Sequence, residues 1–91
     1  MKSIISNEKV CFLCKTPYGI HKHHIFGAYN RWKSEEYGCW VYLCGPHHNL
    51  SDLGVHYNKP LDRELKRLAQ TKFEETHSRA RFMDIFGKNW L

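Results

Sequence analysis

The alternation of apolar and polar residues along the chain predicts two short strands joined by a helix. Residues 20–26 follow the turn-forming sequence Thr-Pro-Tyr-Gly and alternate in polarity, which is typical of a strand. Residues 39–43 are β-branched or aromatic at most positions and predict a second strand. Residues 28–37, followed by Gly38, predict a helix between the two strands.

The last third of the chain has the spacing of two amphipathic helices. Pro60 suits the first position of a helix that we expect to run to His77. Its apolar positions fall on one face, namely Leu61, Leu65, Leu68, Ala69 and Phe73. A second helix, 79–86, has Ser78 as its N-cap and Gly87 as its stop. Its buried stripe would be Phe82, Ile85 and Phe86, and Trp90 would close the core.

These elements predict a single α+β domain over residues 1–91. A motif-bearing core at 10–57 is followed by a helical extension at 58–91, after a polar N-terminal arm at 1–9 that is either loose or an edge strand. Within the core, a short helix opens at residues 44–48, and residues 49–56 are expected to be part helix and part loop. At 91 residues the apolar core is small, so a bound metal ion would add materially to its stability.

Composition favours an intracellular, cytoplasmic protein with a polyanionic partner. The four cysteines are not preceded by a signal-peptide pattern, and no apolar run is long enough to span a membrane. In a reducing compartment a C-x-x-C pair is more often a metal or redox site than a disulfide. The net charge of +5 favours nucleic acid over membranes, although many small basic proteins bind no nucleic acid. The candidate phosphate-contacting residues are Arg31, Lys33, Arg63, Lys66 and Arg67, of which those on the 60–77 helix could equally form a solvated face.

Cysteine and histidine spacings predict a metal-rich first half. Cys11-x-x-Cys14 has the form of a zinc knuckle, and Cys44-x-x-His47 repeats its spacing. The doublets His23-His24 and His47-His48 bring four imidazoles to positions where one metal could gather them. His56 is either a further ligand or a surface or capping residue. Cys39 is expected to be a buried thiol, with a role as zinc ligand as the alternative, and Trp32 a partly buried aromatic or a phosphate neighbour.

The joint order of these motifs is similar to the HNH endonuclease family, the ββα-metal fold in its zinc-stapled form. The resemblance covers Cys11 to about His56, and small stand-alone members of this kind are common in phage genomes. It implies a structural zinc and a catalytic divalent ion, Mg²⁺, Mn²⁺, Ni²⁺ or Zn²⁺. Cys39 occupies the position of the family's middle asparagine, for which Asn30 or Asn49 are candidate substitutes. The implied roles are His24 as general base, His23, His48 and His56 as catalytic-metal ligands, and Cys11, Cys14, Cys44 and His47 as structural zinc ligands.

The resemblance implies metal-dependent hydrolysis of DNA phosphodiester bonds, leaving a 5′-phosphate. Two other classes remain open from the residues alone. A non-catalytic zinc module that binds nucleic acid or protein would use the cysteines and His47 but leave His23, His24 and His48 unexplained. A thiol redox protein needs its C-x-x-C to open a helix in a βαβ unit, whereas Cys14 is followed by turn-forming residues.

Overall fold

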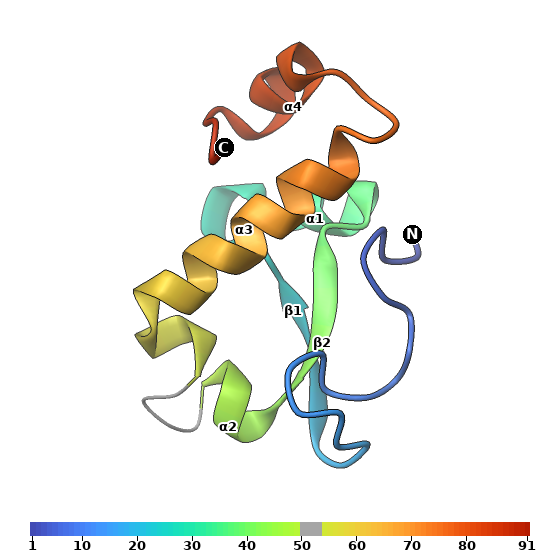
Figure 1. Cartoon of the computed structure of the whole chain (residues 1–91), viewed down its shortest axis with the longest axis vertical. Helices are drawn as coiled ribbons and strands as arrows, with labels where there is room; N and C mark the ends of the chain where they lie inside the picture. The colour runs from blue at the N-terminus through green and yellow to red at the C-terminus, as the bar shows by residue number, and fades with distance from the viewer. Residues whose placement is uncertain (50–53) are drawn as a thin grey trace.

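A computed structural model describes residues 1–49 and 54–91 and shows a two-stranded antiparallel sheet with helices around it (Figure 1). The strands are β1 (Ile20–His24) and β2 (Trp40–Cys44). The helical elements in this part of the chain are η1 (Ala28–Asn30), α1 (Arg31–Tyr37), α2 (Gly45–His48), η2 (Val55–Tyr57), α3 (Lys59–Phe73) and α4 (Arg79–Phe86), where η denotes a 3-10 helix. The predicted α+β class is confirmed at this level.

The register of the sheet places cysteine and histidine positions at opposite ends of the strand pair. Ile20 lies opposite Cys44, and His24 lies opposite Trp40. Since β1 ends at His24, the strand delivers its histidine doublet to the point where the chain leaves the sheet. Cys44 ends β2 in the same way, immediately before α2.

Several predicted boundaries differ from the structure, and the second strand spans Trp40–Cys44 instead of 39–43. The first strand ends at His24 rather than at residue 26, because the backbone N–H of Phe26 bonds the side chain of Ser34 instead of a strand. The predicted helix 28–37 divides into η1 and α1. The helix expected to reach His77 ends at Phe73, and residues 74–77 form turns in which the His77 N–H bonds the Phe73 carbonyl. In the predicted segment 49–56, residues 50–53 lie outside the described part of the chain.

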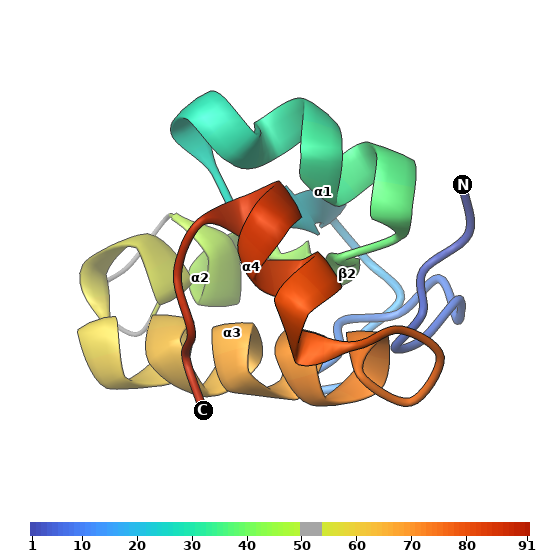
Figure 2. The same ribbon diagram turned by 90° about the horizontal axis from the view of Figure 1, so that it is seen from above.

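The core forms where the two long helices meet the sheet. Leu65, Ala69 and Phe73 of α3 are buried, as the predicted stripe requires. Phe82, Ile85 and Phe86 of α4 are buried against the same cluster, and Trp90 packs on it. Figure 2 shows α4 between α1 and α3, which agrees with the bond from Lys33 on α1 to the Ile85 carbonyl on α4. The predicted face of α4 is therefore confirmed. The face of α3 is confirmed at Leu65, Ala69 and Phe73, whereas its Leu61 and Leu68 are only partly buried.

The N-terminal arm is irregular and bonded along β2, so it is neither a loose arm nor an edge strand. The Ser3 hydroxyl donates to the Trp40 carbonyl at 2.6 Å, and the Ile4 N–H donates to the Gly38 carbonyl at 2.9 Å. Gly38 has a φ of 72°, and a Cβ at this position would collide with the Lys2 carbonyl. This close approach explains why the helix α1 stops at a glycine. Across the described residues, none of the helices combines the length and apolar character needed to cross a membrane.

Candidate metal centres

Four candidate ligands, which we call the cysteine centre, meet below the end of β2. They are Cys11, Cys14, Cys44 and His47, and their ligand atoms all lie within 4.8 Å of one another. Cys14 Sγ lies 3.7 Å from Cys44 Sγ, and His47 Nδ1 lies 3.6 Å from Cys11 Sγ and 3.1 Å from Cys44 Sγ. Ordinary zinc bond lengths in a tetrahedral site place two sulfurs about 3.8 Å apart and a sulfur and a nitrogen about 3.6 Å apart. The donor set and two of the three spacings match such a site, and the 3.1 Å spacing is shorter.

A tight turn positions the first two of these thiols. The Lys15 N–H donates to the Cys11 carbonyl at 2.8 Å, and Lys15 adopts a φ of 65° to close the turn. The Phe12 N–H donates to the Tyr42 carbonyl at 2.8 Å, which fixes the turn to β2. Burial raises the pKa of the Cys11 thiol, but backbone N–H groups of Cys44, Cys14 and Leu13 outweigh it, so the pKa falls from 9.0 to about 6. The turn therefore favours the thiolate, which is the form that binds metal.

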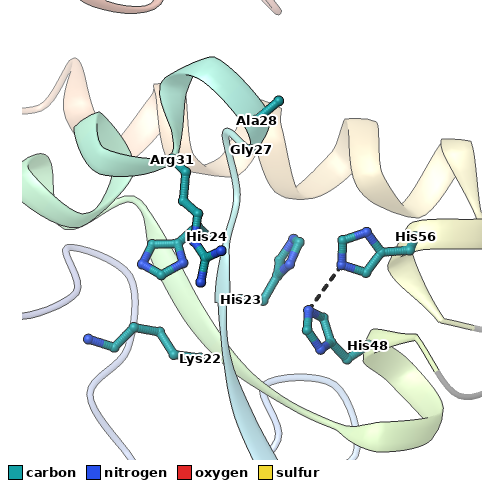
Figure 3. Close-up of a pocket in the computed structure, with 8 residues that line it drawn as sticks. All are labelled: Lys22, His23, His24, Gly27, Ala28, Arg31, His48 and His56. Atoms are coloured by element: carbon teal, nitrogen blue, oxygen red, sulfur yellow. Dashed lines mark hydrogen bonds between the residues drawn. The ribbon is translucent and has the colours of Figure 1, made fainter.

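A second group, the histidine centre, consists of His23, His48 and His56. His23 comes from β1, His48 from the end of α2 and His56 from η2. Figure 3 shows the three rings turned toward one another on one side of β1. His48 Nε2 lies 3.0 Å from His56 Nε2, and the His23 ring centroid lies 5.2 Å from that of His48 and 5.4 Å from that of His56.

His23 is the buried member of the histidine centre. Its residue surface is 4% exposed, and its Nε2 is buried with no hydrogen-bond partner among the described residues. Burial is the main cause that lowers its pKa to about 3, and the charges on His48 and His56 lower it further. Burial also lowers the pKa of His48. A buried neutral imidazole with an unpartnered nitrogen, grouped with two other imidazoles, is what a divalent-metal site of this donor type requires.

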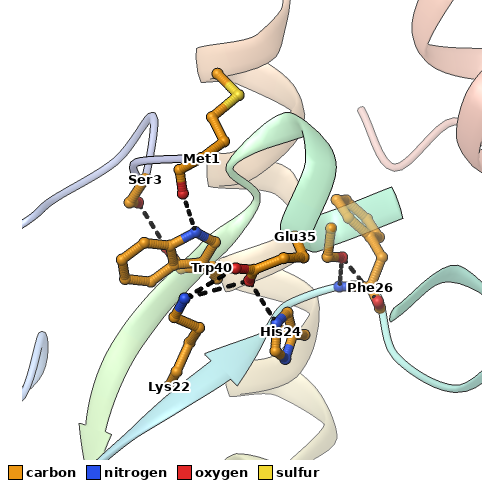
Figure 4. Close-up of polar contacts among 8 residues, drawn as sticks. Met1, Ser3, Lys22, His24, Phe26, Glu35 and Trp40 are labelled. Atoms are coloured by element: carbon orange, nitrogen blue, oxygen red, sulfur yellow. Dashed lines mark hydrogen bonds and ion pairs between the residues drawn. The ribbon is translucent and has the colours of Figure 1, made fainter. Parts of the chain in front are cut away.

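His24, the neighbour of His23, points to the other side of β1 and is bonded to Glu35 of α1. Its Nε2 lies 2.8 Å from Glu35 Oε2, while Lys22 Nζ lies 3.0 Å from Glu35 Oε1 (Figure 4). The hydrogen bond from His24, and then the one from Lys22, lower the pKa of the Glu35 carboxyl below its usual range. Because an ionised carboxylate only accepts hydrogen bonds, His24 Nε2 carries the proton, and Nδ1 of the neutral ring is left as the basic nitrogen.

Both histidines of the doublet nevertheless serve one pocket. The pocket is lined by Lys22, His23, His24, Gly27, Ala28, Arg31, His48 and His56. Successive strand residues point to opposite faces, as Figure 3 shows for this pair, so a shared pocket requires the strand to end. β1 ends at His24, and Gly27 and Ala28 then border the pocket. The arrangement combines three candidate metal ligands, a polarised imidazole and one arginine.

The other predicted site residues take different positions. Arg31 lines the pocket, whereas Lys33 Nζ donates to the Ile85 carbonyl at 2.8 Å. On α3, Lys66 is paired with Asp62 at 2.8 Å and Arg67 with Glu64 at 3.8 Å, and Arg63 is exposed.

Two sequence expectations on single side chains have opposite outcomes. Cys39 is fully buried in the core, where burial raises the pKa of its thiol to about 12, and it lies outside both centres. The expected burial of Cys39 is therefore confirmed. Of the two alternatives for Trp32, partial burial is wrong, because α1 turns Ser34 rather than Trp32 toward the core and Trp32 is 61% exposed. A phosphate contact by Trp32 stays a prediction.

Sequence reasoning missed three residues that support the site. Glu35 fixes His24, and His21 Nδ1 lies 3.2 Å from His48 Nδ1. Ser34 is fully buried, and its hydroxyl accepts from the Phe26 N–H at 3.0 Å and donates to the Phe26 carbonyl at 2.7 Å. These two bonds hold the loop after β1. The Asn30 amide donates to the Phe86 carbonyl, and Asn49 is exposed.

Comparisons of this chain with protein-family models, curated proteins and solved structures found no match. The geometry of the two centres and the order of the motifs are the observations that bear on function.

Proposed function

We propose that this chain is a metal-dependent endonuclease of the HNH type that hydrolyses DNA phosphodiester bonds. The observation that carries the proposal is the pocket that is lined both by three candidate metal ligands and by His24, whose Nε2 is held by the Glu35 carboxylate. A module that only binds zinc would need the cysteine centre but not this second constellation. The ββα-metal arrangement would correspond to β1, β2 and α2, with the histidines at the exits of β1 and α2.

His24 is the proposed general base. Glu35 accepts the hydrogen bond from Nε2, so Nδ1 is available to take a proton from the attacking water. The water oxygen then bonds to phosphorus while the bond from phosphorus to the 3′ oxygen breaks. The departing 3′ oxygen takes a proton from a solvent water, which leaves a 5′-phosphate and a 3′-hydroxyl. Lys22 pairs with the second oxygen of Glu35 and keeps that carboxylate ionised, which preserves the tautomer.

His23, His48 and His56 would hold the catalytic ion. A divalent ion bound there relieves charge on the phosphoryl oxygens and assists the departing oxygen. The three ligands are neutral imidazoles, so the site favours Mn²⁺, Ni²⁺ or Zn²⁺ over Mg²⁺ when no substrate phosphate joins the ligand set. Burial of His23 keeps its imidazole in the neutral form that binds metal at pH 7.

The cysteine centre is the proposed structural zinc site. Its four protein ligands complete a tetrahedral set, which is the usual composition of structural zinc. It ties the turn at Cys11 and Cys14 to the end of β2 and the start of α2. The zinc would therefore fix the helix from which His48 reaches the pocket.

DNA is the proposed partner, and Arg31 is the basic residue best placed to touch the cleaved phosphate because it lines the pocket. Among the basic candidates outside the pocket, Arg63 and Arg67 are exposed on α3, while Lys66 is paired with Asp62. The net charge of +5 supports attraction to a polyanion.

The experiment is metal-dependent nicking of supercoiled plasmid by the zinc-loaded protein, with Mn²⁺ or Ni²⁺ added. His24→Ala should lower the rate by about 10²–10⁴-fold, as expected for loss of a general base, and should keep its zinc and its fold. His77→Ala, which removes an exposed histidine from the turn after α3, is the matched control and should cut like the wild type. A wild type that binds zinc and DNA but never cuts would instead support the non-catalytic binding module.

A further inference from the structure

His21 is a histidine outside both centres, and its ring meets the metal-ligand candidate His48. The two Nδ1 atoms lie 3.2 Å apart, and the rings meet edge to face at an angle of 76° with centroids 5.4 Å apart. We infer that His21 accepts a hydrogen bond from His48 Nδ1 and thereby fixes the tautomer and orientation in which His48 binds metal.

The two ring nitrogens of His48 face different partners, one in the histidine centre and the other on His21. His48 Nε2 lies 3.0 Å from His56 Nε2, so Nε2 is the atom directed at the other candidate ligands. A nitrogen that binds metal carries no proton, and a neutral imidazole has only one. The proton of a metal-binding His48 is therefore on Nδ1. Within residues 1–49 and 54–91, the acceptor that lies within hydrogen-bond distance of this atom is Nδ1 of His21.

The strand explains why His21 is in the right place. Residues two apart on a strand point to the same face, so β1 presents His21 and His23 on the same side. His23 enters the centre as a candidate ligand, while the exposed His21 reaches the far nitrogen of His48. Since α2 spans only Gly45–His48, the last residue of a one-turn helix gains an anchor on the sheet. Partners of this kind commonly change metal affinity by about 10–100-fold when they are removed.

This inference rests on the metal site of the proposed function but not on cleavage. The test is isothermal titration of the zinc-loaded protein with Ni²⁺, comparing the wild type with two variants of His21. His21→Ala removes the acceptor and should weaken Ni²⁺ binding by about 10–100-fold. His21→Asn places an amide oxygen close to the former Nδ1 position and should restore most of the affinity. His77→Ala should bind Ni²⁺ like the wild type, and zinc content and circular dichroism should be unchanged in all variants.

Two outcomes overturn the positioning role. Wild-type affinity in His21→Ala would show that the contact does nothing for the centre. Equal loss in His21→Ala and His21→Asn would show that His21 is itself a ligand, because an amide does not replace an imidazole on Ni²⁺. If the expected order of affinities is found but the wild type cuts no DNA, the inference stands and the nuclease proposal fails. If His21→Ala binds Ni²⁺ normally and the wild type cuts DNA, the inference on His21 fails and the nuclease proposal stands.

Discussion

The cysteine centre and the histidine centre differ in how completely the protein surrounds the ligand atoms. The cysteine centre has four candidate ligands, three of them sulfurs, gathered from a tight turn, a strand end and a helix. The histidine centre has three imidazole nitrogens and opens into a pocket that is also lined by His24 and Arg31. Four protein ligands are typical of a metal that holds a fold together, whereas three leave positions for water and substrate. The difference in ligand number is the reason why we propose a structural role for the cysteine centre and a catalytic role for the histidine centre.

The largest expected effect comes from removing metal from the cysteine centre. Cys14 is exposed, so Cys14→Ser loses little packing, and its effect reports on metal binding alone. We expect this variant to lose zinc and its cooperative thermal transition, because structural zinc contributes apparent binding energies of about 10–16 kcal/mol to small domains. His56→Ala removes an exposed ligand of the other centre and should melt like the wild type.

Elemental analysis and circular dichroism are the measurements for both variants. A folded, zinc-free Cys14→Ser protein would remove the distinction between a structural and a reactive centre.

A smaller effect is expected in the rates at which the cysteine thiols are alkylated, because these thiols differ in burial. Burial raises the pKa of Cys39 to about 12, so this thiol stays protonated at pH 8, and alkylating reagents need the thiolate. At that pH we expect no rapid alkylation of native zinc-loaded protein. After chelation the exposed Cys14 should react first, and Cys39 should follow as the loss of zinc unfolds the chain.

Mass spectrometry of the alkylated peptides over time measures this order. Rapid labelling of Cys39 in the folded, zinc-loaded protein would contradict its assignment to the core.

The smallest effect concerns the loop that borders the histidine centre. Ser34→Ala leaves the Phe26 N–H and carbonyl without their partner at a fully buried position, which should lower the free energy of unfolding by about 1–3 kcal/mol. Thr71→Ala removes an exposed hydroxyl from α3 and should change the free energy of unfolding by less than about 0.5 kcal/mol.

Urea unfolding of zinc-loaded protein compares the two variants. Equal stability of Ser34→Ala and the wild type would show that Ser34 does not hold the loop.

The features that the sequence predicted correctly depend on short-range rules. Residues close together in the sequence determine the N-cap at Ser78, the helix stop at Gly87 and the apolar stripe of α3. The structure has each of these features. Ligand spacing gave the cysteine centre, because Cys11-x-x-Cys14 and Cys44-x-x-His47 constrain their own local geometry. The histidine centre was expected from the resemblance of the motifs, and the residues alone left His56 as either a ligand or a surface residue.

The features that the sequence did not predict depend on how distant elements face one another. Glu35 bonds His24 only because α1 packs beside β1 with one particular helical phase, which no local pattern determines. His21 was overlooked because a strand residue shows its partner only once the neighbouring helix is placed. The end of β1 at His24 likewise depends on Ser34, which lies eight residues beyond Phe26 and binds its backbone. A buried serine in a polar helix carries no sequence signal of that role.

His47 and His48 are adjacent residues of α2, and each turns its ring to a different centre. A helix rotates by about 100° and advances by about 1.5 Å for each residue. Inserting or deleting one residue between Cys44 and His48 would therefore rotate a candidate ligand, His47 or His48, away from its own centre without placing it in the other centre. Most surface loops of a protein tolerate insertions and deletions, but this turn of helix does not. Substitutions can change its chemistry, whereas the number of its residues is fixed by geometry.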